Sequence, residues 1–162
     1  KVVFPLQLLP WSVLLVAAFH FAVGVVLIAA VVLVRSGTLP ATMLALPLIV
    51  LPLALLALGI TYAFSALGVY LRDLGQLAGF LALTLLFLSP VFYPASAVPE
   101  DWRWAIDWNP IAAFIELARG ALLFGAWPGP EVLAVLWILG AGVAWLGFFW
   151  FQRTRRGFAD VL

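Results

Sequence analysis

The sequence predicts an all-α integral membrane protein. Of its 162 residues, 67% are hydrophobic and 9% are charged, whereas a soluble domain carries about 25% charged residues. Four uncharged stretches, residues 2–34, 36–71, 74–99 and 132–152, each exceed the roughly 18 residues that mark a transmembrane helix. Because these stretches are apolar throughout and do not alternate over about 10 residues, they favour helices over the strands of a membrane barrel.

The first two predicted spans form an antiparallel pair. Residues 11–34 make a helix about 36 Å long, which is enough to cross a bilayer with some tilt. Residues 35–40 form a tight turn, and the second span then covers residues 41–70. At about 45 Å this span is longer than the bilayer requires, and Pro47 and Pro52 predict kinks within it.

Two further spans complete the set. The third covers residues 77–91 and follows a short polar turn at residues 71–76. The fourth covers residues 131–151 and is about 32 Å long. We therefore expect four transmembrane helices in a single transmembrane domain that includes the whole of residues 1–162.

The stretch between the last two spans, residues 89–125, is the most unusual part of the chain. It holds four of the seven acidic residues and three of the eight tryptophans. Asn109 followed by Pro110 predicts the start of a helix about 21 Å long, which is too short for the roughly 30 Å bilayer core. Pro99, followed by the acidic residues Glu100 and Asp101, predicts the start of a second short helix. We therefore predict a re-entrant pair of short helices over residues 99–124.

Charge bias orients these elements. The positive-inside rule assigns the side richer in Lys and Arg to the cytoplasm. Four crossings would place five basic residues on one side and three on the other. The five are Lys1, Arg72, Arg153, Arg155 and Arg156, and the three are Arg35, Arg103 and Arg119. The C-terminus is thus predicted to be cytoplasmic, and the pair of short helices is predicted to face outward.

The ionisable residues within these elements allow two interpretations each. Glu116 and Arg119 are three positions apart on one helix and can pair, either as a structural ion pair or as a functional group at membrane depth. Arg72 and Asp73 fit a solvated turn or a contact with a cytoplasmic partner. His20, the only histidine, fits a hydrogen-bonded residue within the membrane.

The aromatic residues of the outward stretch also allow two interpretations. They fit an interfacial belt, in which amphipathic rings lie at the headgroup level. Their concentration beside Phe87 and Phe92 equally fits a path along which flat rings stack on sugars and polar tips bind hydroxyls. The residues concerned are Trp102, Trp104, Trp108, Trp127 and Tyr93.

Several kinds of chemistry are not expected in this chain. It has no cysteine, which excludes disulfides and thiolate sites, and a single histidine cannot form a His-based metal set. No GxxxxGK[ST] phosphate loop occurs, so the energy source for any energised work would lie elsewhere. No dense basic patch suggests nucleic acid. A membrane enzyme would have to use acids of the outer side, namely Glu100, Asp101, Asp107 or Glu116.

The order and spacing of several short segments resemble the membrane subunit of type-2 ABC exporters of polysaccharides, the family that exports O-antigen, capsule and teichoic acid. The resemblance covers all 162 residues. The segments that carry it are Lys1–Pro5 with Leu9-Pro10, Val69–Leu74, Ser89-Pro90-Val91-Phe92-Tyr93-Pro94, Asn109-Pro110 with Arg119-Gly120, and Phe151–Val161.

The resemblance implies a channel-forming permease of the bacterial cytoplasmic membrane that exports lipid-linked polysaccharide. It implies a homodimer bound to two cytoplasmic ATPase subunits, which would hold ATP and Mg. The chain would be the C-terminal part of a longer six-helix permease and would itself hold no catalytic or metal site. A type-2 exporter of a drug or lipid is the alternative within transport, and an enzyme of envelope glycan assembly is the alternative outside it.

Three groups of site residues follow from the resemblance by position. Phe87, Phe92 and Tyr93 would face the channel. The outer gate would include Trp102, Trp104, Trp108, Asn109, Pro110, Glu116 and Arg119. Lys1, Phe4, Arg72 and Asp73 would face the ATPase.

Overall fold

The computed structural model describes residues 6–71 and 73–155, which form helices and connecting turns without a β-strand. Three helices are long and apolar enough to cross a membrane: α1, α2 with the 3-10 turn before it, and α6. In order, the elements are η1 (Leu6–Leu8), α1 (Leu9–Ser36), η2 (Ala41–Ala45), α2 (Leu46–Gly68), α3 (Leu74–Leu88), η3 (Ala95–Ala97), α4 (Glu100–Asp107), α5 (Pro110–Leu123) and α6 (Pro130–Thr154), where η marks a 3-10 helix. The predicted all-α membrane class is confirmed.

Prolines account for the differences between the predicted and observed helix bounds. The second span begins as the 3-10 turn η2, and Pro47 lies in the first turn of α2, where its missing N–H is tolerated. Pro52 lies inside α2. Helix α3 ends at Leu88 and not at residue 91, because Pro90 forces the residue before it out of the helical region. Ser89 accordingly has φ −97° and ψ 144°.

Helix α3 is shorter than the other long helices. Its 15 residues extend about 22 Å, which is less than the roughly 30 Å hydrocarbon core of a bilayer. The fourth crossing therefore stays a prediction.

Helices α2 and α6 form the most extensive helix pair, which we call the α2–α6 frame. The two helices run in the same direction, because Leu48 contacts Trp137 near their starts and Tyr70 contacts Thr154 near their ends. Between these points the backbones touch where Pro52 meets Gly140 and where Gly59 meets Gly147. Contacts seven residues apart on both helices keep one stripe of each helix facing the other.

Glycine is required where the two backbones meet. A Cβ added to Gly147 would lie 2.1 Å from the carbonyl oxygen of Gly59, and one added to Gly140 would lie 2.3 Å from that of Pro52. Atoms cannot approach this closely, so no side chain fits at either position. Small residues allow such close approach, and the resulting dispersion contacts hold membrane helices together where no hydrophobic driving force acts between them.

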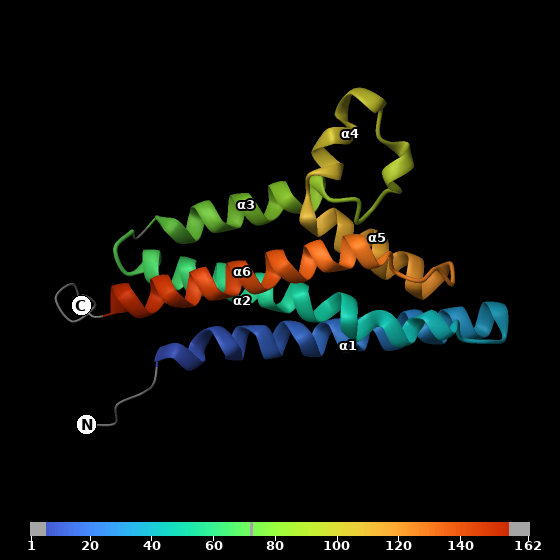
Figure 1. Ribbon diagram of the computed structural model, residues 1–162, viewed down its shortest axis with the longest axis horizontal. Coiled ribbons are helices and arrows are strands. Elements are labelled where there is room, and N and C mark those ends of the chain that lie inside the picture. The colour runs from blue at the N-terminus through green and yellow to red at the C-terminus, as the bar shows by residue number, and fades with distance from the viewer. Residues whose placement is uncertain (1–5, 72, 156–162) are drawn as a thin grey trace.

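Helix α1 runs along the frame as one continuous helix, whereas α3 and α5 follow it as two separate helices (Figure 1). Because α2 and α6 run in the same direction, the chain between them must return from one end of the frame to the other. Helices α3 and α5 make this return one after the other, while α4 projects away between them (Figure 1). The sequence placed both short helices in one hairpin. In the structure α4 contacts α5, and α5 also packs on α2 and η2. That this pair re-enters the membrane stays a prediction.

Helix α5 is attached to the frame by apolar and polar contacts. Phe114 and Ala121 of α5 are buried in the same cluster as Leu46 and Ile49 of α2. The buried hydroxyl of Thr42 donates a hydrogen bond of 2.7 Å to the carbonyl oxygen of Ala121. A buried hydroxyl without a partner would be costly, so this bond fixes the end of α5 against η2.

The close glycine contacts predict that Gly147→Ala destabilises the protein strongly. The new Cβ must displace the backbone of Gly59, and overpacking of this kind costs about 1–3 kcal/mol or more of unfolding free energy. Gly142→Ala on the same helix is the control, because nothing lies within 4 Å of a Cβ at that position. Unfolding by a denaturing detergent in mixed micelles measures the loss of unfolding free energy in both variants. Equal losses in the two variants would contradict the close-packed frame.

Candidate functional site

A cluster of polar groups connects the end of α3 to α5, and we call it the α3–α5 joint. Its members are Ser89, Pro90, Asn109, Glu116 and Arg119. The joint is needed because α3 breaks at Pro90, where the last backbone carbonyls have no partner within the helix. Pro90 and Ser89 are among the most completely buried residues of the described chain. Their polar atoms must therefore find partners within the protein.

Asn109 serves both helices that meet at the joint. Its side-chain oxygen accepts a hydrogen bond of 3.0 Å from the backbone N–H of Ile111, and this contact caps the start of α5. Its side-chain nitrogen donates a bond of 3.0 Å to the hydroxyl of Ser89, 20 residues earlier in the chain. Asn109 is 7% exposed and Ser89 is 1% exposed, so the amide holds the two helix ends together away from solvent.

Arg119 is the second connection in the joint. One terminal nitrogen donates to the carboxylate of Glu116 at 2.5 Å, and the other donates to the backbone carbonyl of Pro90 at 2.5 Å. The rigid fork of a guanidinium suits two acceptors at once. Its positive charge also lies just beyond the C-terminal end of α3, where a cation is favoured by the helix dipole. The predicted Glu116–Arg119 pair is confirmed, and Arg119 also holds the break in α3.

The chain just after the break is held by Tyr93. The hydroxyl of Tyr93 donates a hydrogen bond of 3.0 Å to the carbonyl oxygen of Phe87, one of the last carbonyls of α3. This bond closes the turn over residues 87–93 and leaves Tyr93 half-buried. Phe87 and Phe92 on either side of it are 69% and 75% exposed. The three residues predicted to face a channel are thus adjacent in space, with two of the three rings unburied.

The tryptophans assigned to the outer gate are gathered on and just after α4. Trp102, Trp104 and Trp108 are 65%, 61% and 86% exposed. The predicted start of α4 is confirmed, with Glu100 and Asp101 in its first turn. Helix α4 ends at Asp107, two residues before Asn109, so the joint fixes the C-terminal end of this helix. The structure therefore places three exposed rings on and just after α4, beside the joint.

The residues predicted to face an ATPase are only partly placed. Lys1, Phe4 and Arg72 lie outside the described residues. Asp73 is exposed in the turn before α3, where its side chain makes no capping hydrogen bond. Ser89 was not among the predicted site residues, although a serine that directly precedes a proline at the end of an apolar run is a signal for a buried polar contact.

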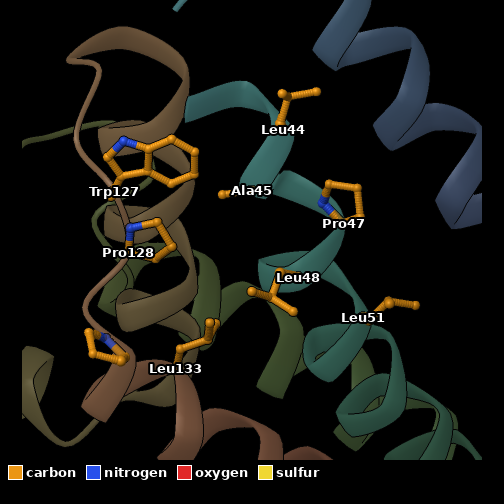
Figure 2. A pocket seen from close by; sticks show the side chains of 9 residues that line it. Leu44, Ala45, Pro47, Leu48, Leu51, Trp127, Pro128 and Leu133 are labelled. Atoms are coloured by element: carbon orange, nitrogen blue, oxygen red, sulfur yellow. The ribbon is translucent and has the colours of Figure 1, made fainter. Parts of the chain in front are cut away.

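An apolar groove lies elsewhere, between the start of α2 and the loop that leads into α6. Figure 2 shows Trp127, Pro128 and Leu133 on one side of it, with Ala45 and Leu48 on the other. The groove has a volume of about 580 Å³, and no titratable side chain lines it. It therefore offers packing surface without groups for catalysis, and the α3–α5 joint with its aromatic surroundings is the candidate functional site.

The joint predicts that Arg119→Met destabilises the protein more than Glu116→Gln. Loss of the guanidinium leaves the buried Pro90 carbonyl without its donor, which costs about 1–3 kcal/mol of unfolding free energy. In Glu116→Gln the amide oxygen still accepts from Arg119, and this partly exposed pair contributes less than about 1 kcal/mol. Unfolding in mixed micelles compares the two. A larger loss for Glu116→Gln would contradict the assigned roles.

The chain is similar in sequence to known transport proteins. Curated relatives that align with the whole chain include two O-antigen export system permease proteins RfbA of Klebsiella pneumoniae, 27% and 25% identical, and one of Myxococcus xanthus, 27% identical. The chain spans 62% or 63% of the length of these relatives. No solved structure matches it significantly. The family described as ABC-2 type transporter matches residues 4–123, and the chain therefore belongs to this family.

Proposed function

We propose that the chain is part of the channel-forming permease of an ATP-driven exporter. Its cargo is lipid-linked polysaccharide, carried from the cytoplasm to the outer face of the bacterial cytoplasmic membrane. The observation that carries the proposal is the exposed aromatic surface around the α3–α5 joint, in a chain whose relatives are named O-antigen export permeases.

The aromatic surface suits a sugar polymer for a physical reason. Rings of Phe and Trp present flat apolar faces to sugar rings, and the indole N–H and phenol hydroxyl bind sugar hydroxyls. Phe87 and Phe92 at the break of α3 and the tryptophans of α4 supply such faces one after another. Contacts that are similar along the whole path let a polymer move without being held at one point. We assign Phe87, Phe92 and Tyr93 to the channel on this basis.

Helices α4 and α5 act as the outer gate in this proposal. The gate includes Trp102, Trp104 and Trp108, with Asn109, Pro110, Glu116 and Arg119 holding its base. The chain crosses the membrane four times with its C-terminus in the cytoplasm, which agrees with the excess of Lys and Arg on that side. Helix α3 and the short gate helices then form the third crossing and its outer end.

Energy comes from partner subunits in this proposal. The permease acts as a homodimer with two cytoplasmic ATPases that bind ATP and Mg, since the chain's own sequence has no phosphate loop. The residues we assign to the ATPase contact are Lys1, Phe4, Arg72 and Asp73. A partner shifts the permease between states only if it contacts those states differently. ATP binding would therefore favour the state in which the path past the joint is open.

Depletion of the permease in its source bacterium tests the proposal. Lipid-linked polysaccharide should accumulate on the inner side of the cytoplasmic membrane, while the surface loses its glycan. Wild-type protein should restore the surface glycan fully and Phe92→Ala only in part, because an exposed ring is removed from the path. Phe19→Ala, an exposed phenylalanine of α1, is the matched control and should restore it fully.

Other outcomes separate the alternatives. Normal surface glycan after depletion would overturn polysaccharide export and favour a drug or lipid as cargo. Purification of the full-length protein without any bound ATPase would favour a membrane enzyme of glycan assembly. Equal restoration of the surface glycan by Phe92→Ala and Phe19→Ala would contradict the proposed aromatic path.

A further inference from the structure

Tyr62 occupies the point where three parts of the protein meet. It belongs to α2 and is 3% exposed. Its ring packs against two rings of α6, with centroids 5.3 Å from both Phe148 and Phe151. Its hydroxyl donates a hydrogen bond of 2.9 Å to the backbone carbonyl of Gln7, 55 residues earlier and in the 3-10 turn η1. A single side chain therefore connects the α2–α6 frame to the beginning of the first membrane helix.

The attachment of η1 is otherwise loose. Leu8 and Trp11 beside Gln7 are 51% and 47% exposed. A cavity of about 370 Å³ lies between this part of the chain and the frame, and Tyr62 lines it together with Leu58, Ala144 and Phe148. Helix α1 has one buried residue among those described, Pro10 in its first turn. Leu14 of α1 packs against the cluster that contains Tyr62, one turn beyond Pro10. Gln7 itself is held by the Tyr62 hydrogen bond.

The frame on the other side of this bond is stiff. Its backbones touch at Gly59, three residues before Tyr62 and therefore on nearly the same face of α2. A displacement of η1 that is transmitted to Tyr62 is thus passed to α2 and α6 together. Without the hydrogen bond, the cavity leaves room for η1 to move while the frame stays in place.

We propose that Tyr62 is a positioning residue that transmits ATP-driven movement from η1 to the α2–α6 frame. This inference rests on the proposed function, in which the residues just before η1 face the ATPase. The Tyr62–Gln7 hydrogen bond is then part of the mechanical connection between ATP hydrolysis and export. Loss of the hydroxyl leaves the ring contacts with Phe148 and Phe151 intact, so the frame itself stays folded.

The test uses the full-length permease assembled with its ATPase in liposomes that contain the lipid-linked glycan. The measured quantity is the amount of glycan exported for each ATP hydrolysed. Tyr62→Phe should hydrolyse ATP but export several-fold less glycan per ATP. Trp137→Phe is the control: it removes the α6 hydrogen bond to the Leu48 carbonyl at the other end of the frame and should leave the ratio unchanged. An unchanged ratio in Tyr62→Phe would overturn the inference.

A second measurement reports on η1 directly. A spin label on Leu8→Cys should become more mobile when Tyr62→Phe is added, and this chain contains no other cysteine. Unchanged mobility would show that the hydrogen bond does not hold η1 and would overturn the inference. Failure of the wild-type complex to export glycan would instead overturn the proposed function, so the two failures are distinguishable.

Discussion

The structure depends on how the protein compensates for the broken helix at Pro90. An interrupted helix leaves its last carbonyl groups without partners in the helix, and a buried group that stays unpaired costs free energy. Arg119 binds the carbonyl of Pro90, Tyr93 binds that of Phe87, and Asn109 binds the hydroxyl of Ser89. The polar residues between α3 and α5 thus have a structural task that comes before any role in transport.

The α2–α6 frame and the joint are held together by different kinds of contact. The frame is stiff because backbones meet at glycines, with no flexible side chains between them. The joint instead relies on directional hydrogen bonds, which fix the end of α3 relative to α5. Helix α4, whose base the joint holds, can therefore carry large exposed rings. Glu116 and Arg119 belong to the joint itself, because Arg119 binds both the Glu116 carboxylate and the carbonyl oxygen of Pro90.

Local signals predicted much of this architecture from sequence. Asn109-Pro110 marked the start of α5, and Pro99-Glu100 marked that of α4, because caps and prolines act within one turn. The Glu116–Arg119 pair followed from its spacing. Contacts between distant segments were not predictable. Nothing local links Ser89 to Asn109 or Gly59 to Gly147, because these contacts exist only once the helices pack.

Cross-linking of Ser89→Cys with Asn109→Cys tests the central claim most directly, because the chain contains no cysteine of its own. In wild-type protein the two side chains are within hydrogen-bond distance. In native membranes, oxidation should protect both introduced thiols from a maleimide reagent, and reduction should restore the labelling, whereas each single variant should label throughout. Continued labelling of the double variant after oxidation would contradict the account, because α3 and α5 would then not meet at this joint.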